Sequence, residues 1–197
     1  MPREAWKLFL SMRFPLRFLV VMALIFGGAN ALAQCVNAAT PSCGVYASCF
    51  AKYCPCEGSP SEYFLTYGEK YCKAFLTSTD FSEAGQKWRD STLICLQEAI
   101  VPHLDIAPNP QCNCTSMRRT AFDSHVGCYT QAGASICDLP AGDITAIGAT
   151  LDLKDLFDAQ GWRQMRDIAA VCSVSAPEDG RRAVWKGFAA TLKLRSP

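Results

Sequence analysis

Twelve cysteines constrain the fold of this chain more than any other feature of its 197 residues. All of them follow Ala33, and none lies in the segment before it. An even number of cysteines in an exported chain predicts a set of disulfides, here six, and no free thiol. The half-cystines are Cys35, Cys43, Cys49, Cys54, Cys56, Cys72, Cys95, Cys112, Cys114, Cys128, Cys137 and Cys172.

The first 33 residues are typical of a secretory signal peptide. Basic residues precede an apolar run from Phe18 to Phe26, and Ala31-Leu32-Ala33 provides a small-residue cleavage site. The run is shorter than the ~20 residues of a spanning helix, so we expect cleavage after Ala33 and no stable membrane insertion afterwards. Met12 would start a signal of more usual length than Met1. The protein is predicted to be secreted or extracellular, or periplasmic if it is bacterial.

Residues 34–197 are expected to form a single disulfide-rich helical domain. A chain of this length buries a core of its own, so the bridges supplement packing rather than replace it. This part carries 15 basic and 17 acidic residues. It therefore offers no broad positive field for nucleic acid or an anionic membrane, and neither is an expected partner.

Apolar residues recur at helical spacing along most of the chain, and no segment alternates as a strand would, so the predicted fold class is all-α. In residues 79–100 the spacing of Phe81, Ala84, Trp88, Cys95 and Ala99 predicts one buried face that carries Cys95, behind a cap at Asp80 or Ser82. Further helices are predicted over 61–78, 115–133 (capped by Thr115 or Ser116), 143–156, 162–172 and from Ser175 onwards, with proline breaks at 57–60 and 107–110.

Short motifs accompany the cysteines. The chain reads YCKAFL from Tyr71, GQKW from Gly85, LIC ending at Cys95, CTSM from Cys114 and CY at Cys128, followed by Cys137 and Cys172. This pattern resembles the stanniocalcin family of secreted helical glycoproteins, which has a C-K-x-F-L helix, a G-x-x-aromatic helix ending in L-x-C, a C-x13-C-Y helix and two later cysteines. Upstream, Cys35, Cys43 and Cys49 resemble the family's first three cysteines.

The resemblance implies a disulfide pairing. It joins Cys35 with Cys49, Cys43 with Cys72, Cys95 with Cys128 and Cys137 with Cys172, and it places a fifth bridge between the Cys54/Cys56 region and Cys114. Two cysteines are then left over, one beside each end of the fifth bridge. We expect the doublets YCPCE and QCNCT to face each other and close two bridges side by side, although which of Cys54 and Cys56 pairs with Cys112 or Cys114 depends on strand direction.

Four thiolates at Cys54, Cys56, Cys112 and Cys114 are also a conceivable tetrahedral zinc site. Structural zinc sites usually space their ligands as C-x2-4-C, and export favours oxidation, so no metal and no cofactor is expected. The acids Asp152, Asp155 and Asp158 are three residues apart and suggest a weak calcium face, but a solvated helix side is the preferred interpretation.

The segment HVGCY, residues 125–129, is similar to the H-D-x-C-Y helix of secreted phospholipases A2. In that family the histidine activates water and the next residue, an aspartate, holds calcium. Val126 stands at the aspartate position here, and a valine offers no oxygen to a hard cation. His125 and His103 are therefore interpreted as ordinary residues, and because every cysteine is expected to be bridged, no nucleophilic thiol remains. The protein is predicted not to be an enzyme.

Two surface features remain open. Asn113-Cys114-Thr115 matches an N-glycosylation acceptor, but a bridged Cys114 would compete with glycan transfer. The terminal helix carries basic residues around Val184, Phe188 and Leu192, which fits binding to a membrane surface or a partner, or a packed helix with a basic outer face.

The expected function is that of a secreted, hormone-like or partner-binding regulator. The resemblance implies it, since animal stanniocalcins are secreted regulators linked to calcium and phosphate balance and to inhibition of a metalloproteinase. The partner is expected to be a protein or receptor. Nothing after Cys172 is available to link two subunits, so no disulfide-linked dimer is predicted. A carrier of a small apolar ligand is the alternative, and a phospholipase A2-like hydrolase is third.

Overall fold

The computed structural model describes residues 35, 40–156 and 159–194. The predicted signal peptide lies outside these residues. Every regular element in the described part is helical and none is a strand, which confirms the all-α class. In chain order the elements are η1 (Tyr46–Phe50), α2 (Ala51–Tyr53), η2 (Phe64–Gly68), α3 (Glu69–Thr77), α4 (Glu83–Ile100), η3 (Val101–His103), α5 (Cys114–Tyr129), η4 (Ile136–Asp138), α6 (Ala141–Thr150), α7 (Leu153–Leu156), α8 (Ala159–Ser175) and α9 (Asp179–Leu194).

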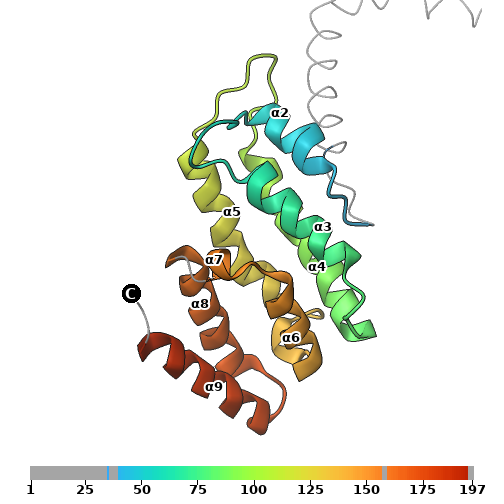
Figure 1. The fold of residues 1–197 in the computed structure, drawn as a ribbon, viewed down its shortest axis with the longest axis vertical. Coiled ribbons are helices and arrows are strands. Elements are labelled where there is room, and N and C mark those ends of the chain that lie inside the picture. Colours follow the sequence, from blue (N-terminus) through green and yellow to red (C-terminus); the bar gives the residue numbers. More distant parts are fainter. Residues whose placement is uncertain (1–34, 36–39, 157–158, 195–197) are drawn as a thin grey trace, which may run out of the picture.

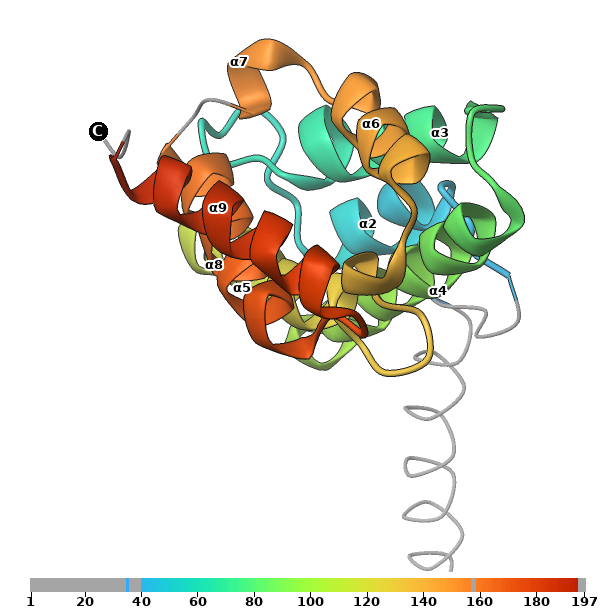
Figure 2. The same ribbon diagram turned by 90° about the horizontal axis from the view of Figure 1, so that it is seen from below.

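The long helices form two connected groups (Figure 1). Helices α3, α4 and α5 pack together, and α6 lies against α3. Helix α8 packs on α5 and forms a hairpin with α9, which covers α8 at the end of the molecule (Figure 2). No described helix is long and apolar enough to span a membrane.

The core between these helices is rich in aromatic rings. Trp88, Phe50, Phe64 and Phe122 are each at most 2 % exposed. Burying one such side chain contributes roughly 2–3 kcal/mol, so packing stabilises the fold alongside the disulfides. The indole of Trp88 also donates a hydrogen bond to the Tyr129 carbonyl at 3.1 Å, which joins α4 to the end of α5.

The start of α4 is held by a residue far along the chain. Ser82 is the N-cap, and its hydroxyl accepts from the Gly85 amide at 3.2 Å. The carboxylate of Asp143, which is 2 % exposed, accepts from the Ser82 amide at 2.8 Å and from its hydroxyl at 2.6 Å. Asp143 lies in the first turn of α6, so these bonds join the beginnings of two helices.

The buried face of α4 differs from the predicted one. Ala84 is exposed and Cys95 is half-buried, whereas Trp88, Thr92, Leu96 and Ile100 line the core. The centre of the face therefore lies beside Cys95. A half-cystine that is bonded to a neighbouring helix lies at the edge of the contact between the two helices, because its sulfur has to extend to the other helix.

Three predicted boundaries were also wrong. Asn113, not Thr115 or Ser116, caps α5, because its side-chain oxygen accepts from the Ser116 amide at 2.9 Å. The segment predicted as one helix over 143–156 is interrupted at Leu151, whose extended backbone (ψ 138°) separates α6 from α7. Helix α8 continues to Ser175, so α9 begins at Asp179, after Pro177.

Candidate functional site

All twelve half-cystines are joined in six disulfides, and no cysteine is free. The bridges fasten the N-terminal segment to α3, residues 54–56 to the start of α5, α4 to α5, and η4 to α8. The pairs are those that the stanniocalcin resemblance implies, with the doublets completing the set. They are Cys35–Cys49, Cys43–Cys72, Cys54–Cys112, Cys56–Cys114, Cys95–Cys128 and Cys137–Cys172.

The two doublets pair in the same direction, since Cys54 joins Cys112 and Cys56 joins Cys114. Cys54 precedes Pro55 and has φ −146° and ψ 74°, outside the helical region, as expected before a proline. The Cys56 sulfur lies 3.6 Å from that of Cys54 and 3.9 Å from that of Cys112. These sulfurs are as close as zinc ligands, but each is bonded to another sulfur and therefore offers no thiolate to a metal.

Asn113, the candidate glycosylation residue, lies between the two bridged cysteines. Its side chain is exposed, and its oxygen is the α5 cap. Glycan attachment at its nitrogen stays a prediction.

His125 lies inside the aromatic core and is 4 % exposed. Its Nδ1 is 2.8 Å from the Ala121 carbonyl, and its ring contacts those of Phe122 and Tyr129, at 5.4 and 5.5 Å between centroids. Burial, opposed only in part by hydrogen bonds to the backbone, lowers the pKa of His125 to about 4. The ring is thus neutral at physiological pH and is bonded to a carbonyl rather than to a carboxylate, which favours the structural interpretation.

The cavity beside His125 is small. Its walls include Tyr46, Tyr67, Thr92 and Leu96, and its volume is about 30 Å³, close to the space of one water molecule. Burial raises the pKa of Tyr46, and it raises that of Tyr129 to about 12, so both phenols stay neutral. A space of this volume is too small for a lipid chain.

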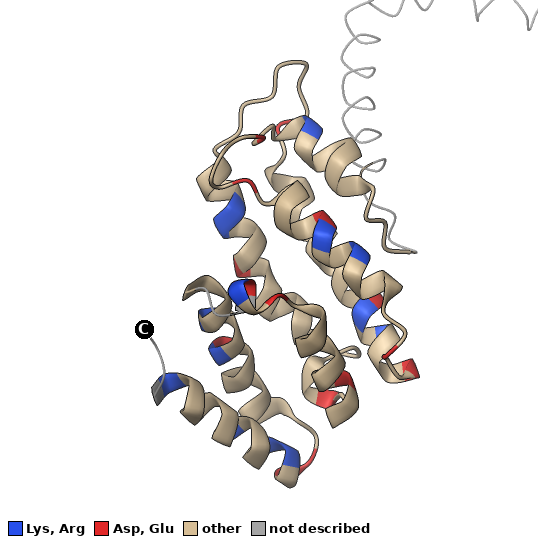
Figure 3. Cartoon of the chain, in the orientation of Figure 1, with Lys and Arg blue, Asp and Glu red and all other residues tan. Residues whose placement is uncertain are grey.

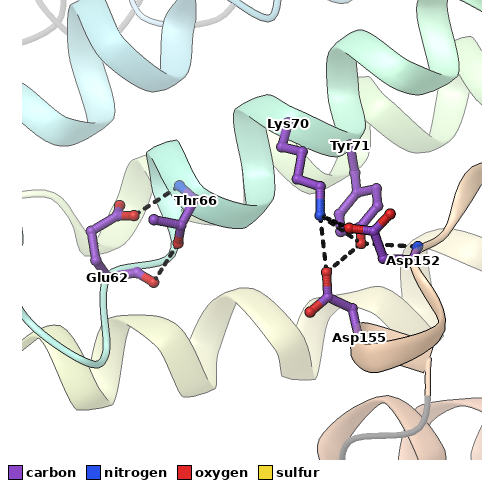
Figure 4. Close-up of polar contacts among 6 residues, drawn as sticks. All are labelled: Glu62, Thr66, Lys70, Tyr71, Asp152 and Asp155. Carbon is purple, nitrogen blue, oxygen red and sulfur yellow. Dashed lines mark hydrogen bonds and ion pairs between the residues drawn. The ribbon is translucent and has the colours of Figure 1, made fainter.

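The predicted acidic face is occupied by a lysine. Lys70 of α3 donates to Asp152 and, at 3.1 Å, to Asp155, and the Tyr71 hydroxyl also donates to Asp155 (Figure 4). The backbone amide of Asp152 donates back to Tyr71 at 3.2 Å. The two acids are therefore not a free solvated helix side, as the sequence suggested, but attach α7 to α3. Asp158 lies outside the described residues.

In this cluster the lysine and the two aspartates stabilise each other's charged forms. Although burial opposes it, hydrogen bonds from Tyr71 and Lys70 lower the pKa of Asp155. The hydrogen bond to Asp152 is the main cause of the raised pKa of Lys70. Since Asp152 and Lys70 are partly exposed, the ion pair contributes at most about 1 kcal/mol. An ammonium already stands where a calcium ion would bind.

Glu62 and Thr66 form a second polar contact in the same view (Figure 4). The Glu62 carboxylate accepts from the amides of Leu65 and Thr66, at 2.9 and 2.8 Å. The Thr66 hydroxyl donates to the Glu62 carbonyl at 3.0 Å. Glu62 therefore satisfies two amides in the first turn of η2, a structural role.

An open apolar groove lies between α6 and α9. It has a volume of about 580 Å³, within the range of ligand-binding clefts. Trp185 forms its floor at 8 % exposure, while Val184 and Phe188 are 72 % and 42 % exposed. The other wall contains Leu139, Pro140, Ala141 and Ile144.

One basic side chain lines the α9 side of this groove. It is Arg181, which donates to the carbonyl oxygens of Asp138 and Leu139. Lys186 is exposed on α9 but does not line the groove. Leu192 packs inward, so of the three apolar residues singled out in the sequence, Val184 and Phe188 point outward. The name α6/α9 groove is used below for this surface. Its residues are Leu139, Pro140, Ala141, Ile144, Val184, Trp185 and Phe188.

Comparison with known proteins yields no relative: no protein-family model, curated protein or solved structure matches this chain. The resemblance to the stanniocalcin family therefore stays a prediction based on cysteine spacing and short motifs. Fold and site have to be interpreted from the chain's own residues.

Several buried or paired side chains were not singled out from the sequence. Asp143 entered only as the first residue of the predicted helix over 143–156, and Lys70 was assigned no role. Gly85 was the one available signal, because a glycine inside a helix often marks a close approach. A Cβ added there would lie 2.5 Å from an Asp143 oxygen.

Proposed function

We propose that this protein is an exported, non-enzymatic regulator that acts by binding a protein partner, as the resemblance to stanniocalcin implies. The signal-like first 33 residues and six disulfides support export into an oxidising compartment. The buried, carbonyl-bonded His125 and the bridged cysteines support a role without catalysis.

The observation that carries the proposal is the α6/α9 groove. Two large apolar side chains, Val184 and Phe188, stay exposed on α9 although the rest of that helix buries Trp185, Ala189 and Leu192. Exposed apolar surface in a groove is typical of a binding site. An apolar groove of this kind accepts the apolar face of an amphipathic helix, and Arg181 in its lining favours an acidic residue beside that face, so the partner is assigned an acidic amphipathic helix.

The test compares two valine-to-glutamate variants of the full, oxidised chain. V184E places a negative charge in the groove, whereas V174E makes the same change at the 77 % exposed Val174 on α8, outside it. Labelled protein is titrated onto cells of the source organism. We expect saturable binding that V184E weakens at least tenfold and V174E by less than twofold. Binding that does not saturate, or that both variants weaken equally, would refute the proposal.

Native mass spectrometry of protein purified from the medium distinguishes a regulator from a carrier of a small apolar ligand. The regulator is expected to show the mass of the chain alone, and a stoichiometric lipid would favour the carrier. Phospholipid hydrolysis measured with and without calcium tests the third function, and turnover that is lost in H125F would establish an enzyme.

A further inference from the structure

A second groove, between α5 and α8, has the opposite character. Its volume is about 860 Å³, and its lining is mostly polar. Gln164 of α8 donates to the Phe122 carbonyl of α5 at 2.8 Å and so fixes the two walls relative to each other. The lining residues are Thr115, Arg118, Arg119, Phe122, Asp123, Val126, Gln160, Arg163, Gln164 and Asp167.

The arginines of this groove differ from the other described arginines. Outside it, Arg89, Arg166, Arg181 and Arg182 each have a carboxylate within 4.0 Å. Inside it, no ion pair among the described residues involves Arg118, Arg119 or Arg163. Arg118 instead stacks over the Phe122 ring, 4.9 Å from its centroid. Three guanidiniums thus line one groove, and none of them has a carboxylate of the described residues within 4.0 Å (Figure 3 shows the basic positions on both helices).

Two acids also line the groove and set its net charge. Asp167 forms its ion pair, at 3.2 Å, with Arg166 rather than with an arginine of the lining. Asp123 is exposed, and none of the three arginines approaches within ion-pair distance of it. The groove therefore keeps a positive surplus on a chain whose predicted mature part carries more acidic than basic residues.

The lining residues indicate which kind of ligand this groove binds. An amphipathic helix needs a row of apolar anchors, and here Phe122 is 1 % exposed and Val126 only half-buried. The lining residues lie on two neighbouring helices only, which suits a small anion rather than a long polyanion. Guanidinium forks bind sulfate, phosphate and carboxylate oxygens in pairs, so the three lining arginines suit a ligand that carries more than one such group.

We propose that the α5/α8 groove binds a small organic anion with two or more sulfate or phosphate groups, about the size of a disaccharide. The site is separate from the α6/α9 groove and does not depend on the proposed function. Arg118, Arg119 and Arg163 contact the anionic groups, and Gln164 holds the walls.

The test is calorimetric titration of the full oxidised chain at physiological salt with a trisulfated heparin disaccharide, with pyrophosphate and with acetate. We expect the disaccharide or pyrophosphate to bind at one site per chain. Whichever of the two binds more tightly shows whether the groove prefers a sulfated sugar or a phosphate compound. Acetate is expected to bind at least a hundredfold more weakly. A short glutamate peptide is a fourth probe. If it binds more tightly than both multivalent anions, the proposal is overturned.

Charge-matched variants locate the site. R163Q is expected to weaken binding at least tenfold, and R119Q provides a second, exposed position if R163Q does not fold. K186Q removes the same charge from α9 and should change affinity less than twofold, while D123N should tighten binding. Absence of binding by both multivalent anions, or equal losses in R163Q and K186Q, would overturn the proposal.

Discussion

Replacing Gly85 with alanine tests the contact between α4 and α6 most directly. The new Cβ would lie 2.5, 2.6 and 2.9 Å from Oδ1, Cγ and Oδ2 of Asp143, far inside van der Waals contact. The buried carboxylate would have to move and weaken both bonds to Ser82. Each hydrogen bond to a charged group contributes about 1.5–3 kcal/mol. Since alanine is favoured over glycine in a helix by up to ~1 kcal/mol, we expect G85A to lose about 2–3 kcal/mol net.

The double variant gives the sharper result. D143A alone is expected to lose about 3 kcal/mol, because the Ser82 amide and hydroxyl lose their acceptor. Once the carboxylate is absent, nothing opposes the Cβ at position 85. G85A in the D143A background should then be neutral or stabilising by up to ~1 kcal/mol, which is a coupling of about 3 kcal/mol between the two positions.

The assay is urea unfolding followed by far-ultraviolet circular dichroism, with all disulfides intact. G127A is the matched control: Gly127 is in α5, and a Cβ there would meet nothing within 4 Å. It should stabilise the protein by about 0.5–1 kcal/mol. An equal cost of G85A with and without Asp143, or a neutral G85A, would refute the reasoning.

Two further predictions concern a bridge and a histidine. C137S/C172S opens a loop of 35 residues and should cost about 4 kcal/mol in urea unfolding, and a loss under 1 kcal/mol would contradict this. Burial lowers the pKa of His125 from 6.5 to about 4, so on acidification the unfolded state binds a proton before the folded state does. The contribution of His125 to the free energy of unfolding is therefore complete above pH 6.5, and it falls by up to ~3 kcal/mol as the pH drops to about 4. H125F should remove this part of the pH dependence, which is measured by urea unfolding between pH 4 and 7. The control H103Q changes an exposed histidine and should leave the pH dependence as it is.

The helix pattern shows how far local information reaches. Ser82 was a correct N-cap candidate because a cap and its helix are neighbours in the chain. The buried face of α4 was placed only in part correctly: Trp88 is buried as predicted, but Ala84 is exposed and Cys95, which bridges to α5, is half-buried. The break at Leu151 was missed since Lys70 and Tyr71, which hold the residues after it, are more than 80 positions away.

The sequence by itself determined the all-α class and the expected number of six disulfides, because helical periodicity and a cysteine count need no knowledge of distant contacts. The resemblance to the stanniocalcin family further implied that the two cysteine doublets face each other. Only the tertiary structure decided their register, the Asp143–Ser82 bond across 61 positions, and the meeting of Arg118 and Arg119 with Arg163. The physical reason is that burial, charge compensation and grooves belong to pairs of surfaces, and the packing of α5, α6, α8 and α9 creates those surfaces.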